Sequence, residues 1–273
     1  EYFGFAGAET FGADRAGFAT MEEDMKTVFM FSGQGAQYAG MGKDLYKNYP
    51  VAKEIFDRAD NVLGYSIKDI CFEDEQKLGE TEFAQPAILT MSIAAMKVLE
   101  EEGVRADMTA GLSLGEYSAY VASEAMDFEE AVALVQKRGK FMAEAVPSGE
   151  GAMYAIIGLD TALVEEACAE ATAEGDGLAV PANYNAPGQI VIAGHAQAAK
   201  RAAALAKEKG AKLTVPLKVS GPFHTELLQP AAEKLGPELD KMHISPMKMP
   251  VYTNVDASKV ASEQDIIPIL KKQ

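Results

Sequence analysis

The chain has 273 residues, 48% of them hydrophobic and 24% charged, which suits one large or two modest soluble domains with a proper core. Its formal charge of −16 argues against nucleic acid as a partner, and no apolar run reaches the roughly 18 residues of a membrane helix. Cys71 and Cys168 form no C-x-x-C pair, and His195, His224 and His243 are not spaced as metal ligands. We therefore expect a cytoplasmic protein that holds no metal and does not enter the membrane.

Residues 1–24 follow no hydrophobic period and precede candidate start residues at Met21 and Met25. They also lack the basic stretch followed by an apolar one that marks a secretory signal. We interpret them as a leader, tag or flexible extension outside the fold.

An alternation of strands and helices starts at Thr27. The apolar run 28–31 ends in Ser-Gly-Gln-Gly, which predicts a buried strand entering a tight glycine loop. Helical patterns follow, and a second short strand approaches a second glycine turn. This order predicts a parallel sheet with helices on its faces, as in hydrolase-like α/β domains. The expected elements are helices 51–63 and 86–102, the latter with Pro86 near its first turn, a strand over 108–111 and a helix from Glu116.

Residues 151–219 show a different order of elements, βαββαβ, which matches a ferredoxin-like unit. We predict that 151–220 is a small domain inserted into a large α/β domain made of 25–150 and 221–273. The expected elements are strands 152–157, 178–183, 189–193 and 212–217, a helix 162–173 capped by Asp160 or Thr161, and a helix 196–209 stopped by Gly210.

Residues 111–115, Gly-Leu-Ser-Leu-Gly, fit the pattern G-x-S-x-G. Two glycines permit a sharp strand-to-helix turn that exposes the Ser113 hydroxyl, and the N–H of the next residue then faces a developing oxyanion. The pattern alone is weak, because chance matches are common, and a structural turn with an incidental serine is the alternative.

The glycine loop Gly33-Gln34-Gly35-Ala36-Gln37 follows the first expected strand. At that sheet edge it could supply a second oxyanion N–H near Ser113. Neither phosphate-loop pattern fits: Asp44 follows Gly42-Lys43, and Tyr38 stands at the third glycine of G-x-G-x-x-G. A plain strand-to-helix loop remains the alternative.

Arg138 lies within the apolar stripe of a helix that spans 128–145, whereas Lys137 and Lys140 fall outside the stripe. An arginine in that position needs an anionic partner or a wet cleft. It is either one half of a structural ion pair or an anion-binding guanidinium that faces a pocket.

His224 lies in an irregular segment after the small domain and is a candidate general base, although a lone histidine is more often a packed or surface residue. His195 is expected near a helix cap, and His243 in a polar turn.

Four features coincide in one order: GQGAQ, GLSLGE, Arg138 and Pro-Phe-His at 222–224. Over residues 26–273 the chain resembles malonyl-CoA:acyl-carrier-protein transacylases and the related acyltransferase domains of polyketide synthases. Segments 183–189 and 254–256 also resemble the family. The resemblance does not separate fatty acid from polyketide synthesis.

The resemblance implies roles for individual residues. Ser113 would be the nucleophile and His224 its base, and the N–H groups of Gln34 and Leu114 would bind the oxyanion. Arg138 would bind the malonyl carboxylate. The two remaining expectations are Gln273, whose backbone carbonyl would orient the histidine, and Phe223, which would limit room at the α-carbon of the acyl group.

The chain departs from the family at two points. Leu112 stands where the family usually has histidine, so any role of that histidine is lost, although backbone oxyanion donors do not need it. The family chain also continues past the position of Gln273 with a further strand and helix, so we expect the C-terminal end of the large domain to be incomplete.

The reaction implied is transfer of a malonyl group from coenzyme A to the phosphopantetheine thiol of acyl carrier protein through a malonyl-serine. We expect no cofactor and a monomer. A serine hydrolase or thioesterase on the same fold is the alternative, and a catalytically dead binding module is a third. Because family carrier proteins are acidic, a local basic patch should face the cleft. Its candidate members are Lys212, Lys218, Lys234 and Lys241, which could also be scattered surface lysines.

Overall fold

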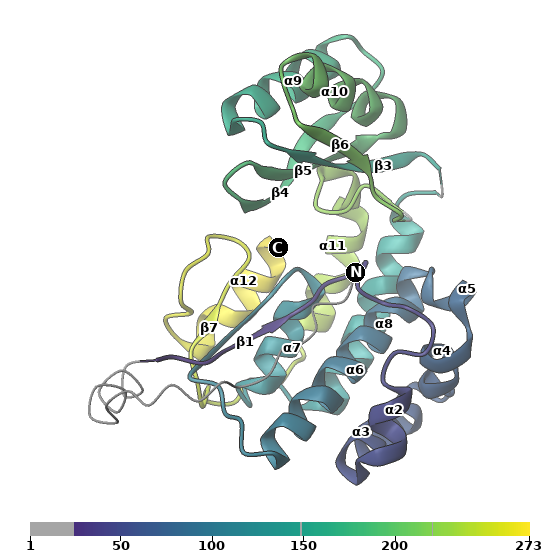
Figure 1. The fold of residues 1–273 in the computed structure, drawn as a ribbon, viewed down its shortest axis with the longest axis vertical. Coiled ribbons are helices and arrows are strands. Elements are labelled where there is room, and N and C mark those ends of the chain that lie inside the picture. Colours follow the sequence, from purple (N-terminus) through teal and green to yellow (C-terminus); the bar gives the residue numbers. More distant parts are fainter. Residues whose placement is uncertain (1–24, 148, 220) are drawn as a thin grey trace, which may run out of the picture.

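The computed structural model describes residues 25–147, 149–219 and 221–273 (Figure 1). The expected leader at 1–24 lies outside the described residues. A larger body occupies the lower part of the view, and a smaller body stands above it. None of the helices among the described residues combines the length and apolar character needed to cross a bilayer.

The larger body contains a three-stranded parallel sheet in the order β1-β2-β7. Its strands are β1 (Val28–Phe31), β2 (Met108–Gly111) and β7 (Val251–Tyr252). Helix α7 (Leu114–Ala122) packs on β1 and β2, and behind it lie α6 (Thr81–Glu101) and α8 (Phe128–Ala145). The parallel sheet and its helices confirm the predicted α/β class. The other elements of this body are α2 (Lys43–Asn48), α3 (Pro50–Leu63), α4 (Ile67–Glu73), α5 (Glu75–Leu78), η1 (Glu226–Leu228), α11 (Gln229–Leu239), η2 (Glu263–Asp265) and α12 (Ile266–Lys272).

Strand β1 corrects one expectation. It was predicted to be buried, yet Val28 is 42% and Met30 81% exposed, and only Phe31 is buried. The reason is position, because among the described residues β1 is an edge strand that pairs with β2 alone, and α7 covers one of its faces.

Helix α6 corrects a second expectation, since it begins at Thr81, five residues before Pro86. The carbonyl of Glu80 accepts hydrogen bonds from the N–H groups of Phe83 and Ala84 and so starts the helix early. Proline lacks an N–H and is unfavourable inside a helix, so a boundary at Pro86 was the simpler interpretation of the sequence. Here Pro86 is buried, and the packing of this long helix outweighs the lost hydrogen bond.

The smaller body holds an antiparallel sheet in the order β4-β5-β3-β6, which is the strand order of a ferredoxin-like fold. Helices α9 and α10 pack against it, as the upper part of Figure 1 shows. This confirms the predicted second fold unit. Its elements are β3 (Gly151–Ile157), α9 (Thr161–Ala173), β4 (Ala179–Ala186), β5 (Gln189–His195), α10 (Ala196–Glu208) and β6 (Leu213–Pro216).

The two crossings between the bodies lie together. A Cβ on Gly151 would come within 2.2 Å of the Pro222 ring, so the two connecting segments are in direct contact. Ser148 and Ser220 lie outside the described residues. We propose that the small domain spans 151–220 and that the large domain comprises 25–150 and 221–273.

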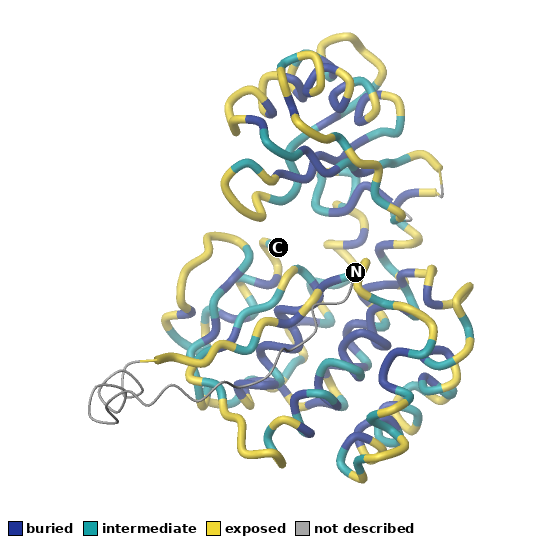
Figure 2. The backbone as a smooth tube through the Cα atoms, in the orientation of Figure 1, coloured by how far each residue is buried: buried dark blue, intermediate teal, exposed yellow. Residues whose placement is uncertain are grey.

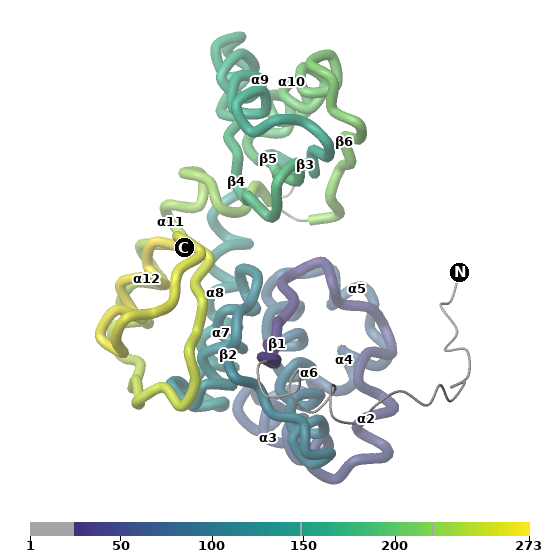
Figure 3. The backbone as a smooth tube through the Cα atoms, turned by 60° about the vertical axis from the view of Figure 1, so that its left-hand side comes forward, coloured from purple at the N-terminus to yellow at the C-terminus, as the bar shows by residue number. Residues whose placement is uncertain are grey.

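A shared apolar cluster joins the bodies, because Met153 and Val191 of the small sheet pack with Met142 of α8 and Phe223. The larger body has its own core around α6, α7 and α8, where Figure 2 shows mostly buried backbone. In the turned view of Figure 3, the C-terminal segment lies beside α11 and below β4. The fold thereby brings residue 273 and the loop after the small domain to the N-terminal end of α7.

Candidate active site

Ser113 occupies a strained turn between β2 and α7. Its backbone angles are φ 51° and ψ −105°, a conformation that side-chain-bearing residues rarely adopt. Glycine is required on both sides, because a Cβ on Gly111 would lie 2.0 Å from the Gly115 carbonyl and one on Gly115 would lie 2.2 Å from the Phe31 carbonyl. The G-x-S-x-G sequence therefore builds a sharp elbow that presents the serine at the N-terminus of a helix.

The Ser113 hydroxyl and His224 are in direct contact. Oγ of Ser113 lies 2.8 Å from Nε2 of His224, and Nδ1 of His224 lies 3.0 Å from the backbone carbonyl oxygen of Gln273. A carbonyl only accepts, so Nδ1–H donates to it and Nε2 carries the free lone pair. The ring is thus held in the tautomer that can take the serine proton.

The pKa of His224 is lowered from 6.5 to about 4. Burial is the largest cause, since it penalises the charged imidazolium, and the positive charge of Arg138 adds to it. The hydrogen bond to the Gln273 carbonyl opposes both. The histidine is therefore neutral and able to accept a proton at physiological pH.

Arg138 is buried on α8, at 6% exposure, while Lys137 and Lys140 are exposed, which confirms its predicted place in the apolar stripe. Its guanidinium donates to Oε1 of Gln85 at 2.8 Å and to Oε1 of Gln273 at 3.0 Å. It also lies over the Tyr117 ring, 5.4 Å from the centroid. No carboxylate of the described residues is within ion-pair distance, so a structural ion pair does not explain the arginine within that part of the chain.

Gln34 lies on the glycine loop after β1, and Leu114 is the first residue of α7, directly after the serine elbow. A Cβ on Gly33 would come within 2.5 Å of the Leu112 carbonyl, so the glycine loop after β1 rests against the elbow. No described residue accepts a hydrogen bond from the backbone N–H of Gln34 or Leu114. The Gln34 side chain is occupied, because its Oε1 accepts from the Thr81 hydroxyl at 2.7 Å.

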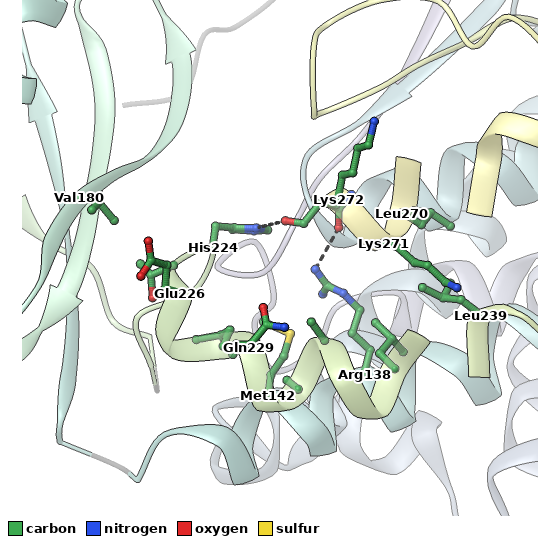
Figure 4. Close-up of a pocket in the computed structure, with 16 residues that line it drawn as sticks. Arg138, Met142, Val180, His224, Glu226, Gln229, Leu239, Leu270, Lys271 and Lys272 are labelled. Atoms are coloured by element: carbon green, nitrogen blue, oxygen red, sulfur yellow. Dashed lines mark hydrogen bonds between the residues drawn. The ribbon is translucent and has the colours of Figure 1, made fainter. Parts of the chain in front are cut away.

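Two cavities flank His224, and Gln273 and Lys272 line both of them. One cavity, of about 370 Å³, includes Arg138 and Met142. Figure 4 shows Arg138 and His224 on either side of the α12 C-terminus, with dashed lines that mark their bonds to it. The other cavity, of about 780 Å³, is lined by residues of both bodies, among them Leu112 and Tyr184.

The remaining sequence candidates lie elsewhere. The Phe223 ring is buried in the cluster that joins the two bodies and lines neither of these cavities, and its expected effect on the acyl group stays a prediction. His195 is the N-cap of α10, as expected, and its Nδ1 accepts from the Leu178 N–H at 2.9 Å. The described residues contain no cluster of three or more metal-ligating side chains.

Four polar residues of the site had no role assigned from the sequence: Thr81, Gln85, Glu116 and Asn254. Oδ1 of Asn254 accepts from the Ser113 N–H at 2.9 Å, and Gln85 connects Arg138 to Thr81. Glu116 and Gln85 are the larger polar side chains at buried positions of α7 and α6, and the sequence could have indicated them because such side chains need a hydrogen-bonding partner.

Comparison with known proteins points to one family. Residues 28–267 match the family model described as the acyl transferase domain. The malonyl CoA-acyl carrier protein transacylase of Bacillus subtilis (strain 168) is 50% identical over 242 residues, 88% of this chain and 76% of the relative. The protein of the same name from Escherichia coli (strain K12) is 49% identical over 231 residues, 84% of this chain and 74% of the relative.

Solved structures agree. The crystal structure of MCAT from Streptococcus pneumoniae has a TM-score of 0.85 and 50% identity, covering 90% of this chain and 80% of that one. A malonyl-transacylase in complex with a type II PKS acyl-carrier protein has a TM-score of 0.86 and 41% identity, covering 91% of this chain and 80% of that one.

Proposed function

The chain belongs to the acyl transferase domain family, among its malonyl CoA-acyl carrier protein transacylases, and from that premise we propose that it transfers malonyl groups from coenzyme A to an acyl carrier protein through Ser113. The observation that carries the site assignment is the contact between Oγ of Ser113 and Nε2 of His224, at 2.8 Å. A serine and a neutral histidine at this distance form an activated nucleophile.

In the first half-reaction, Nε2 of His224 takes the Ser113 proton while the serine oxygen attacks the thioester carbonyl. The negative charge on the carbonyl oxygen is bound by the N–H groups of Gln34 and Leu114. The intermediate then collapses, the carbon–sulfur bond breaks, and coenzyme A leaves with the proton that His224 carries. The product is a malonyl ester on Ser113.

In the second half-reaction, the phosphopantetheine thiol of the carrier gives its proton to His224 and attacks the ester carbonyl. The same N–H groups bind the oxyanion. Collapse breaks the bond to the serine oxygen, which recovers the proton from His224. Water must be kept from the ester between these steps, because its attack would make the enzyme a hydrolase.

Arg138 binds the carboxylate of the malonyl group. Its guanidinium is buried and hydrogen-bonded only to uncharged oxygens, so an incoming carboxylate would supply the charge partner that the described chain does not. A general serine hydrolase has no use for this arginine. The histidine also contacts a carbonyl where a hydrolase of this class would place a carboxylate, which argues against that alternative.

The test is mass spectrometry of the intact protein after mixing with malonyl-CoA in the absence of carrier protein. We expect a malonyl adduct on the wild-type chain that disappears when a phosphopantetheinylated carrier is added. Ser113→Ala is the matched control and should give no adduct. A malonyl adduct on Ser113→Ala would refute the site, and release of malonate without transfer would favour the hydrolase.

A further inference from the structure

Glu116 is a fully buried carboxyl group on α7, three residues after the nucleophile, and it reaches no reacting atom. No lysine, arginine or histidine of the described chain lies within ion-pair distance of it. Its oxygens instead accept hydrogen bonds from three uncharged residues. Oε1 accepts from the Tyr120 hydroxyl at 3.0 Å, and Oε2 accepts from the Asn254 backbone N–H at 2.9 Å, from the Asn254 side-chain amide and from Nε2 of Gln273 at 2.9 Å.

Asn254 and Gln273 connect Glu116 to the backbone of Ser113. Oδ1 of Asn254 accepts from the Ser113 N–H at 2.9 Å, while its Nδ2 also donates to the Gly111 carbonyl at 2.7 Å. Nε2 of Gln273 also donates to the Ser113 carbonyl at 3.2 Å. Both peptide groups of a strained residue are thus bonded to side chains that one carboxyl group holds. Such strain persists only where the surroundings over-determine the conformation.

Gln273 extends the same connection to the base and to Arg138. Its backbone oxygen accepts from Nδ1 of His224 at 3.0 Å, and its side-chain oxygen accepts from Arg138 at 3.0 Å. The orientation of Gln273 therefore decides where the histidine ring and the guanidinium lie, and the hydrogen bond to Glu116 fixes that orientation.

We propose that Glu116 is a positioning residue that, through Asn254 and Gln273, holds the Ser113 elbow and the carbonyl that orients His224 in one arrangement. The proposal rests on the proposed function and concerns the same site. A carboxylate suits the position because it is acceptor-only and every group that faces it is a donor. A glutamine there must turn its N–H₂ group either to the donors of Asn254 and Gln273 or to the Tyr120 hydroxyl, and in either case it lacks the charge that strengthens these hydrogen bonds.

The test is Glu116→Gln, with Tyr120→Phe as the matched control. Tyr120→Phe also removes a hydrogen bond of Glu116, but at Oε1, away from Asn254 and Gln273. The measurement is single-turnover formation of malonyl-serine from malonyl-CoA, with the rate normalised to the number of serines finally acylated. A displacement of about 1 Å in a catalytic group costs up to roughly 10²-fold in rate. We expect a loss of that order for Glu116→Gln, with little change in KM for malonyl-CoA, and a normal normalised rate for Tyr120→Phe.

If the carboxyl group is purely structural, either variant will lower the melting temperature or the fraction of active protein, and the normalised rate of each will stay at the wild-type value. That result would overturn the proposal. If Glu116→Gln does not fold, Asn254→Ala keeps the carboxyl group and breaks its connection to Ser113, so a wild-type normalised rate in that variant would overturn the proposal too. Failure of the proposed function is distinguishable, because the wild-type chain itself would then form no malonyl-serine.

Discussion

Arg138 donates a hydrogen bond to the nucleophile itself, with its Nη2 3.3 Å from Oγ of Ser113. The same nitrogen donates to Gln273, and Nη1 donates to Gln85, so all the acceptors are uncharged oxygens. A carboxylate that entered the cavity would offer the guanidinium two charge-assisted hydrogen bonds and would meet it beside the reacting oxygen. From this geometry we expect Arg138 to select between acyl groups.

Arg138→Ala should reduce the specificity constant for malonyl-CoA far more than that for acetyl-CoA. Removal of one partner of a buried charge pair costs about 2–5 kcal/mol. Acetyl has no carboxylate and makes no ion pair with Arg138, so the substitution should cost it far less. The wild-type preference for malonyl, which we expect to reach roughly 10⁴-fold where a site demands a polar partner, should narrow or invert. Steady-state kinetics with both thioesters in both proteins measures the effect.

Arg138→Lys serves as the control for charge. An ammonium keeps the positive charge but cannot reproduce the planar fork, so this variant should recover only a small part of the malonyl rate. An equal loss on malonyl and acetyl in Arg138→Ala would mean that the arginine acts only on the structure, and the malonyl selection would lose its physical basis.

Acylation should remain fast well below neutral pH. The reaction needs neutral His224, which is the form present above its pKa of about 4. A histidine with an ordinary pKa near 6.5 would be only about 10% neutral at pH 5.5, whereas His224 would still be almost wholly neutral there. We therefore expect a nearly constant single-turnover rate of malonyl-serine formation from pH 8 to about 5.5, and a fall only as the pH approaches 4.

Arg138→Ala provides the matched comparison, with acetyl-CoA as the substrate for both proteins. The positive charge of Arg138 is the second cause of the lowered pKa, so its removal should raise the pKa of His224. The fall of the acylation rate on the acid side should then occur at a higher pH. A wild-type rate that already halves near pH 6.5 would show that burial and Arg138 do not depress this pKa.

The four lysines expected at the cleft fall into two groups. Lys234 pairs with Glu144 at 2.7 Å, and Lys241 pairs with Glu238 at 2.6 Å. Lys212 and Lys218 are exposed and make no ion pair within the described part of the chain. The positive charges of Lys212 and Lys218 are therefore not offset by a neighbouring carboxylate of the described residues, and these two lysines are the better candidates for binding an acidic carrier protein.

The charge reversals Lys212→Glu and Lys218→Glu, made together, should raise the KM for carrier protein, and the rise should shrink with added salt. The KM for malonyl-CoA should stay nearly unchanged. The pair Lys234→Glu and Lys241→Glu controls for a general gain in negative charge and should have a smaller effect. If both pairs of substitutions change the KM for carrier protein and the KM for malonyl-CoA equally, Lys212 and Lys218 do not form a local docking patch.

Much of the fold could be predicted because the local signals were strong. The change from βα alternation to the order βαββαβ predicted two sheets, since each order is compatible with few topologies. Asp160 was one of two suggested caps for α9, and its side chain indeed accepts from the Ala162 N–H. The boundary of α6 was wrong because long-range packing outweighed the local cost of Pro86.

A site residue could be predicted from the sequence only where the residue type itself indicated a function. Arg138 stood out as a cation in an apolar stripe, and the structure places it against Ser113. Asn254 could not be assigned from the sequence, because its function depends on a contact with a residue 141 positions away. The role expected of Phe223 stays a prediction: its ring packs in the cluster that joins the two bodies, and neighbouring a catalytic candidate in sequence does not make a side chain face the same cavity.

Gly115→Ala should damage both the fold and the reaction. The new Cβ would lie 2.2 Å from the Phe31 carbonyl oxygen and 3.0 Å from that of Ser32, and backbone atoms cannot rotate away as a side chain can. Helix α7 must then separate from β1, at a cost of about 1–3 kcal/mol for an overpacked contact, which also moves Leu114 away from the Gln34 loop. We expect a lower free energy of unfolding together with a lower rate of malonyl-serine formation. Gly236→Ala, in α11, is the control, because the new Cβ would lie 3.9 Å from the Lys271 side chain, an ordinary van der Waals contact. Alanine favours a helix by about 1 kcal/mol over glycine, so this variant should be at least as stable as wild type and fully active.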